Sequence, residues 1–187
     1  MSETPSYLQD ATDLLTKEGF ATSDVWYHGT SSALVNSIES YGLKRSGDKA
    51  MNQAAKSTMA TVGNTYTEST EPVFLTQSKE LAYYWAEQTV KERSVRFEGE
   101  EKSVIFAVKL PEELNTKVKP DVGAATLLMV KEGEAYMAYA AKIYQNCDRA
   151  VLDIDLMTAG RLEYLNKLGM AYINQDIDPE YVSLVSS

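Results

Sequence analysis

The stretch Val25-Trp26-Tyr27-His28-Gly29-Thr30-Ser31-Ser32 organises the rest of the chain, because it holds the only histidine. The apolar, β-favouring run before His28 predicts a strand that ends at this residue. Gly29 then predicts a turn, and Ser31 or Ser32 is a suitable N-cap for a following helix. A titratable ring, a glycine that admits a ligand to the backbone and free helix N–H groups would meet there. The stretch therefore favours a ligand site, with a locally bonded structural histidine as the alternative.

The composition limits the class of protein. A chain of 187 residues with 44% hydrophobic residues suits one domain with a proper core. The net charge of −9 argues against a protein that coats duplex nucleic acid, but not against brief contact with nucleic acid. No apolar run is long enough to span a bilayer, and the N-terminus lacks a signal peptide. We therefore expect a soluble, cytoplasmic protein, located in the host cytosol if a phage encodes it.

Histidine and cysteine are too scarce for several kinds of catalytic or metal site. The single Cys147 excludes an internal disulfide and fits a reducing compartment. With one histidine and one cysteine, a zinc site is not expected. A Ser-His-Asp or Cys-His arrangement would have to use His28, and neither has a supporting local motif. We expect no metal site.

Hydrophobic periodicity predicts a mixture of helices and strands. Helices are expected over residues 4–19, 32–41, 79–93, 124–145 and 158–168. Strands are expected over residues 25–28, 73–76, 103–110, 150–155, 170–173 and 181–185. Residues 44–70 show no sustained period and predict a long surface loop, either a mobile insertion or a flap over a ligand. The elements do not alternate as regular βαβ units, which favours the α+β class.

Three pieces of sequence then stand in a fixed order. They are Tyr27-His28-Gly29-Thr30-Ser31, the strand 73–76 followed by Trp85-Ala86 on a helix, and the late Glu180-Tyr181-Val182. This order resembles the ADP-ribosyltransferase superfamily, on the diphtheria-toxin-like side that includes the poly-ADP-ribose polymerases and many small bacterial and phage enzymes. The resemblance covers residues 25–110. It implies a fold of two small, packed, mainly antiparallel sheets flanked by helices.

The expected organisation is one ADP-ribosyltransferase-like domain over residues 1–187. It would comprise an N-terminal helix over 1–20, the long loop over 44–70 and a helical insertion over 111–150.

The resemblance also implies a role for each residue of the histidine stretch. His28 would hydrogen-bond a ribose hydroxyl of NAD, which serves as a co-substrate. The backbone of Gly29 would grip the carboxamide of nicotinamide. Thr30 and Ser31 would lie near the adenosine ribose or the phosphates.

Aromatic residues are implied for the nicotinamide ring. Phe74 takes the place of the family's first tyrosine, and Trp85 takes the place of the aromatic residue that stacks on nicotinamide. Tyr84 is the neighbour that would share this wall. For Phe74 or Trp85 taken alone, a place in the core is the favoured interpretation, so the joint pattern carries the assignment.

The third motif can be matched in two registers. In one, the catalytic glutamate of the family falls on Glu180. In the other, the sequence 178–182 matches a family ending that follows the catalytic strand. The catalytic position then falls near Met170 or Ala171, where no carboxylate is present.

The resemblance therefore implies an NAD-dependent mono-ADP-ribosyltransferase that releases nicotinamide and modifies a macromolecule. Cleavage of the nicotinamide–ribose bond passes through an oxocarbenium-like centre, so it needs ring binding, ribose positioning and one negative charge. The acidic composition favours a protein over a nucleic acid as the acceptor. The alternatives are an NAD glycohydrolase, an RNA 2′-phosphotransferase-like enzyme using Lys44, Arg45 and Lys49, and a binding module that has lost catalysis.

Overall fold

The protein is of the α+β class, with two antiparallel three-stranded sheets in the computed structural model, which describes residues 3–63, 65 and 70–187. Sheet 1 has the strand order β1-β3-β6, formed by Val25–Ser31, Ser103–Lys109 and Val182–Leu184. Sheet 2 has the order β2-β5-β4, formed by Val73–Leu75, Ala171–Ile173 and Lys119–Pro120. The predicted class and the two small antiparallel sheets are therefore confirmed.

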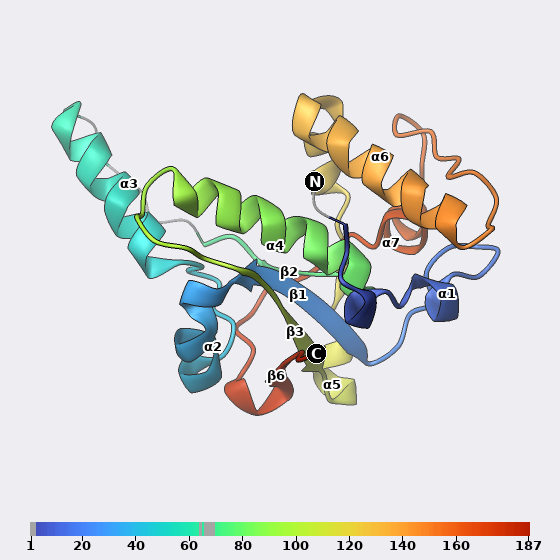
Figure 1. The fold of residues 1–187 in the computed structure, drawn as a ribbon, viewed down its shortest axis with the longest axis horizontal. Coiled ribbons are helices and arrows are strands. Elements are labelled where there is room, and N and C mark those ends of the chain that lie inside the picture. Colours follow the sequence, from blue (N-terminus) through green and yellow to red (C-terminus); the bar gives the residue numbers. More distant parts are fainter. Residues whose placement is uncertain (1–2, 64, 66–69) are drawn as a thin grey trace.

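Helices surround the two sheets (Figure 1). The α-helices are α1 Ala11–Leu14, α2 Val35–Tyr41, α3 Lys49–Thr61, α4 Lys79–Ser94, α5 Glu112–Asn115, α6 Lys131–Asn146 and α7 Arg161–Leu168. Short 3₁₀ helices are η1 Ser6–Leu8, η2 Ser32–Leu34, η3 Gly123–Ala125, η4 Leu127–Met129 and η5 Pro179–Tyr181. Helix α4 crosses sheet 1 along β1, while α3 projects from the body of the molecule (Figure 1).

Strand β3 is covered on both faces, as its near-continuous apolar sequence predicts. Phe106 and Val108 join a core cluster with Trp26 on one face. Ile105 joins a second cluster on the other face, together with Ala82 of α4. The alternation along one strand thus supplies two hydrophobic layers, and α4 lies over the second.

Strand β1 runs three residues further than the sequence predicts. It pairs with β3 from Val25 opposite Lys109 to Ser31 opposite Ser103. His28 therefore lies in the middle of the strand, and the predicted turn at Gly29 is wrong. The physical reason is close packing, because a Cβ at Gly29 would collide with the backbone carbonyl of Ala82 on α4.

The predicted long loop over residues 44–70 is wrong in its central part. Residues 49–61 form α3, and the carboxylate of Asp48 caps it by accepting hydrogen bonds from the amides of Ala50 and Met51. This helix has no fully buried residue, which is why its apolar pattern is weak. The prediction for residues 64 and 66–69 lies outside the described residues.

The predicted N-terminal helix is broken in two at Gln9 and Asp10. The Asp10 carboxylate accepts hydrogen bonds from the Ser78 hydroxyl (2.7 Å) and the Lys79 amide (2.8 Å) at the start of α4. In return, Glu80 accepts a hydrogen bond from the Ala11 amide at 2.8 Å. A tertiary capping interaction therefore interrupts a stripe of apolar residues that the sequence suggests is continuous.

The later elements follow the sequence with two exceptions. The helix predicted over residues 124–145 begins only at Lys131, as α6, after the short helices η3 and η4. Helices α4 and α7 and strands β3, β5 and β6 form where the pattern predicts, and Gly169 ends α7 with a positive φ of 65°. The predicted strand over 150–155 is wrong, because the chain is irregular there and Val151 is 85% exposed. The predicted helical insertion over 111–150 contains α5, β4, η3, η4 and α6.

Candidate functional site

The two sheets meet at a single bridge and then separate. The Tyr27 amide donates to the Thr76 carbonyl at 2.8 Å, and the Thr76 amide donates to the Tyr27 carbonyl at 3.0 Å. One step further, Nδ1 of His28 lies 2.9 Å from the carbonyl oxygen of Phe74. We call the opening beyond this bridge, between Gly29 of β1 and Phe74 of β2, the fork.

The partner of His28 fixes the arrangement of protons on its ring. A carbonyl oxygen can only accept a hydrogen bond, so Nδ1 must carry the proton that is shared with Phe74. In the neutral imidazole, Nε2 is then left as an acceptor. The ring can therefore receive a hydrogen bond from a hydroxyl group of a ligand.

Burial keeps the imidazole neutral. Desolvation lowers the pKa of His28 below its ordinary value of 6.5, while the hydrogen bond to the Phe74 carbonyl acts in the opposite direction. The residue as a whole is half-buried. At neutral pH, His28 is accordingly a positioned acceptor rather than a cation.

Gly29 presents backbone groups to the fork. Alternate residues of an edge strand direct their N–H and C=O groups to opposite sides. Tyr27 directs its pair towards Thr76, so Gly29, two residues later, directs its pair to the same side. A continued ladder would pair Gly29 with Phe74, but the Phe74 carbonyl already bonds the His28 ring. The fork therefore contains a backbone donor and an acceptor beside each other.

Phe74 lies on the face of the sheets that α4 covers. Tyr27 packs against the α4 cluster, and residues directly opposite on neighbouring strands share a face. Thr76 is opposite Tyr27, and Phe74 follows on the same face because side chains alternate along β2. Phe74 is 46% exposed, which is unusual for a ring in the centre of a short strand. Its ring is available to a ligand in the fork.

Trp85 is half-buried on the side of α4 that faces sheet 2. One turn earlier on the same helix face, Leu81 packs close to Gly169, just before β5. The Trp85 ring packs on Tyr136 of α6, with centroids 5.0 Å apart and planes at 32°. Tyr84 meets its edge at 5.1 Å. Trp85 is thus held by core aromatic rings and directed towards the sheet 2 side.

Tyr84 cannot form a wall of the site, which corrects the sequence-based expectation. It is 1% exposed, and its hydroxyl donates to the Glu132 carbonyl at 2.9 Å. Among the described residues, no ring contact joins Trp85 to Phe74. Any stacking slot between these two rings would have to be completed by the ligand.

Thr30 and Ser31 are also poorly placed to bind a ligand. They are 3% and 0% exposed. The Ser31 hydroxyl donates to the Glu101 carboxylate and accepts from the Ala33 amide at 3.1 Å. Glu101 in turn pairs with Arg93 of α4 at 2.7 Å. Both residues are buried and the Ser31 hydroxyl is used within the fold, which argues against the expectation that they lie against adenosine or phosphate.

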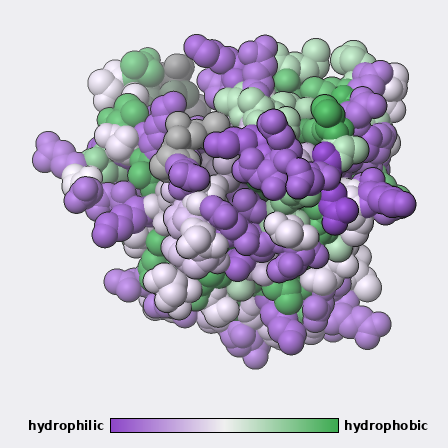
Figure 2. Space-filling view, turned by 45° about the vertical axis from the view of Figure 1, so that its right-hand side comes forward, coloured by the Kyte–Doolittle hydropathy of each residue, from purple (hydrophilic) through white to green (hydrophobic). Residues whose placement is uncertain are grey.

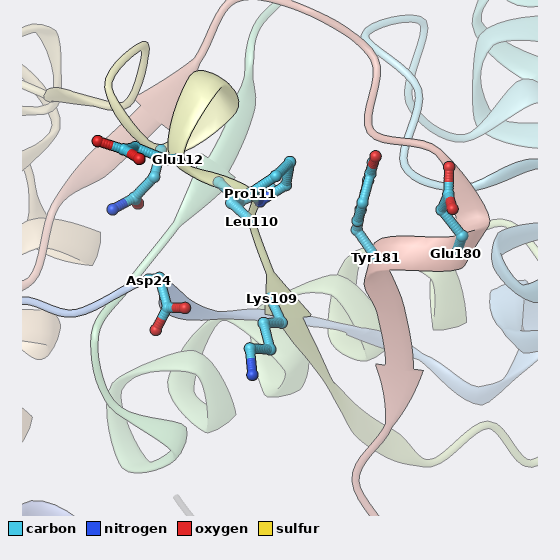
Figure 3. A pocket seen from close by; sticks show the side chains of 8 residues that line it. Asp24, Lys109, Leu110, Pro111, Glu112, Glu180 and Tyr181 are labelled. Atoms are coloured by element: carbon cyan, nitrogen blue, oxygen red, sulfur yellow. The ribbon is translucent and has the colours of Figure 1, made fainter.

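Glu180 lies away from the fork. Its 3₁₀ helix η5 precedes β6, which is paired to the far side of β3 from β1. Glu180 and Tyr181 line a shallow hollow beside Lys109 and Asp24 at the end of sheet 1 (Figure 3). The strand order therefore places β3 between the strand that carries His28 and the segment that carries Glu180.

In the second register of the third motif, the catalytic position falls near Met170 or Ala171, at the start of β5. Ala171 is buried on the face away from α4, and Met170 is 5% exposed in the core cluster beneath that helix. The residue directly opposite Phe74 is Tyr172. No residue of β5 carries a carboxylate.

Tyr172 and its neighbour Lys119 were not identified as site residues from the sequence. Lys119 lies opposite Tyr172 on β4, so Phe74, Tyr172 and Lys119 form one row across sheet 2. The signal that finds them is the pairing register of three very short strands. Hydrophobic periodicity does not predict this register, because β4 contains only two residues and two residues show no period.

Comparisons with known proteins leave the chain unassigned, because no family model, no curated protein and no solved structure matches it. Within the described residues, none of the helices is long and apolar enough to cross a membrane. The same part of the chain contains no group of three or more His, Cys, Asp or Glu residues that could hold a metal ion. Hydrophilic residues dominate the face in Figure 2, in keeping with the net charge of −9.

Proposed function

We propose that the protein binds NAD at the fork and is an NAD-dependent mono-ADP-ribosyltransferase with an ADP-ribosyltransferase-like fold. The observation that carries this proposal is the hydrogen bond from Nδ1 of His28 to the Phe74 carbonyl. This hydrogen bond ends the pairing of the two sheets, so the backbone groups of Gly29 are not paired with β2. It also leaves Nε2 of His28 as an acceptor. These features suit the nicotinamide riboside half of NAD.

The groups of the fork match those of nicotinamide. A carboxamide has one N–H donor group and one carbonyl acceptor, which complement the C=O and N–H of Gly29. The exposed ring of Phe74 offers a face to the cationic pyridinium, an attraction of about 0.5–2 kcal/mol. Nε2 of His28 accepts a hydrogen bond from a ribose hydroxyl. Trp85 supplies a second aromatic surface on the α4 side.

The reaction requires few protein groups. The bond between C1′ of the ribose and the pyridinium nitrogen breaks, and its electron pair leaves with nicotinamide, which departs neutral. The resulting oxocarbenium-like carbon forms a bond to an oxygen or nitrogen atom of the acceptor, which loses a proton to solvent. The contribution of the chain is to hold the ring and ribose in the reactive orientation. The net charge of −9 favours a basic protein as the acceptor.

The direct test is to incubate the purified protein with labelled NAD and a cell lysate. The expected result is release of free nicotinamide together with label on macromolecules. His28→Ala should abolish both signals. Nicotinamide release without a labelled acceptor would instead identify an NAD glycohydrolase. Absence of both NAD binding and nicotinamide release would refute the proposal.

A second candidate function is an NAD-binding module that does not catalyse transfer. The observation in its favour is that Tyr172 lies opposite Phe74, while Glu180 lies beyond β3. The fork would then bind the dinucleotide without a negative charge near C1′. Under this hypothesis the wild type binds NAD without releasing nicotinamide, and Tyr172→Glu gains measurable release.

The RNA 2′-phosphotransferase-like alternative receives less support. Its phosphate would need several free basic groups, but Lys44 lies 3.5 Å from the carboxylate of Asp176. Arg45 donates to the Thr70 carbonyl at 2.8 Å. Two of the three basic residues considered for this role, Lys44 and Arg45, thus already contact oxygen atoms of the chain.

A further inference from the structure

The row formed by Phe74, Tyr172 and Lys119 is an aromatic and cationic surface that continues outward from the fork. Phe74 is opposite Tyr172, and Tyr172 is opposite Lys119, so the three side chains share one face. Neighbouring strands are about 4.8 Å apart, so the row extends about 10 Å from Phe74 to Lys119. It begins at the ring that we assign to nicotinamide.

The side chains of this row are free to act on a ligand. Phe74 is 46% exposed, Tyr172 is half-buried and Lys119 is exposed. Among the described residues, no hydrogen bond holds the Tyr172 hydroxyl and no carboxylate forms an ion pair with Lys119.

This combination of groups fits one kind of ligand. A flat aromatic face stacks on any nucleobase, whatever its identity. A nearby ammonium group attracts the phosphate that the nucleotide carries. The alternative position for adenosine and phosphate, at Thr30 and Ser31, is buried, and the Ser31 hydroxyl is already hydrogen-bonded within the fold. The row is therefore the better location for a second nucleotide near the fork.

We propose that the row is a nucleotide-binding platform, with a base stacked on Tyr172 and a phosphate at Lys119. The nucleotide has two possible sources, namely the adenylate half of the NAD bound in the fork and a nucleotide of a nucleic-acid acceptor. If the nucleotide is the adenylate half of NAD, this inference rests on the proposed function. If it belongs to a nucleic-acid acceptor, it does not. Binding of a free nucleotide does not depend on catalysis and can be measured separately.

The experiment measures equilibrium binding of AMP, of NAD and of a short single-stranded oligonucleotide by calorimetry. Tyr172→Ala should weaken AMP binding about tenfold, because it removes the stacking surface. Lys119→Glu should also weaken AMP binding and should reduce its dependence on salt, whereas Tyr172→Phe should retain most of the affinity. Tyr41→Ala, at a tyrosine that is 64% exposed on α2, and Lys56→Glu, at an exposed lysine on α3, are the matched controls.

The pattern across ligands distinguishes the two sources. A parallel loss of NAD and AMP affinity, with no oligonucleotide binding, identifies the adenylate half of NAD. A loss of oligonucleotide affinity with unchanged NAD affinity identifies an acceptor nucleotide. AMP binding that is absent, or equal in the wild type, Tyr172→Ala and Lys119→Glu, overturns the platform. AMP binding that depends on Tyr172 in a protein that never binds NAD would support the platform and refute the proposed function.

Discussion

The imidazole of His28 occupies the hydrogen-bonding position that a continued strand would give to the amide of Gly29. Its Nδ1 donates to the carbonyl oxygen of Phe74 at 2.9 Å, one step beyond the last bridge between the two sheets. A side chain thus replaces a backbone group at the point where the sheets separate. This substitution leaves the Gly29 N–H and C=O groups available, and the predictions below depend on it.

Tryptophan fluorescence should report ligand binding through one of the two tryptophans. Trp85 is half-buried on α4, whereas Trp26 is 2% exposed and its Nε1 donates to Asn115 at 2.8 Å. We expect NAD to quench the emission, because a pyridinium ring stacks on an indole. Trp85→Phe should remove the quenching and Trp26→Phe should retain it. Equal quenching in both variants would place the ligand elsewhere.

Gly29→Ala should strongly destabilise the protein. The new methyl group would collide with the backbone of Ala82 and Ala86 on α4, and a helix backbone cannot yield as a flexible side chain can. We expect a loss of about 3 kcal/mol in the free energy of unfolding, measured with urea. Gly160→Ala is the control, because nothing lies within 4 Å of the added Cβ. It should lose less than about 1 kcal/mol, and comparable losses in both variants would contradict the packing explanation.

The buried ion pairs of Arg93 should contribute to stability. Its guanidinium pairs with the carboxylates of Glu101, at 2.7 Å, and of Asp48. Arg93→Met should cost about 3 kcal/mol, because it leaves carboxylates without their cation. Lys117→Met, at a solvent-exposed pair with Glu113, should change the free energy of unfolding by less than about 0.5 kcal/mol.

The same network predicts a dependence of stability on pH. The hydrogen bond from Arg93 holds the pKa of Glu101 below its ordinary value of 4.5. This contribution is present above pH 4.5 and is lost as the pH falls through the lower, folded-state pKa. Arg93→Met should flatten the acid side of the stability profile. An unchanged profile would show that the pair does not contribute.

Glu80 should have the opposite effect on the pH profile. Burial raises its pKa above 4.5, although the hydrogen bond from the Ala11 amide acts against this. The folded state then binds the proton more tightly than the unfolded chain, so this residue lowers stability as the pH rises above 4.5. Glu80→Gln keeps an acceptor for the Ala11 amide and should remove that decline. A steeper decline in the variant would contradict this sign.

The sequence predicted the elements whose packing is local. Helix α4 has a strong cap at Ser78, and β3 has a continuous apolar run, so both form where the pattern places them. It did not predict features that depend on distant partners. Asp10 interrupts the first helix because it caps α4, and Gly29 remains in a strand because α4 packs closely against it.

Some residues of the candidate site were likewise identified from the sequence, and others were missed. His28, Phe74 and Trp85 were identified through the resemblance to the ADP-ribosyltransferase superfamily, and the structure places His28 and Phe74 at the junction of the sheets and Trp85 on α4. Tyr172 was missed because its position depends on the register of three short strands. The placement of Glu180 could not be predicted either, because the order β1-β3-β6 is a property of the folded sheet.

The most direct test of the fork uses the single histidine of the chain as a probe. Because there is only one imidazole, a long-range ¹H–¹⁵N NMR spectrum contains one pair of ring-nitrogen resonances. At neutral pH we predict a neutral ring with its proton on Nδ1, a pKa below 6.5 and a shift of the Nε2 resonance when NAD is added. A ring protonated on Nε2 alone, or resonances that do not move at saturating NAD, would contradict the account.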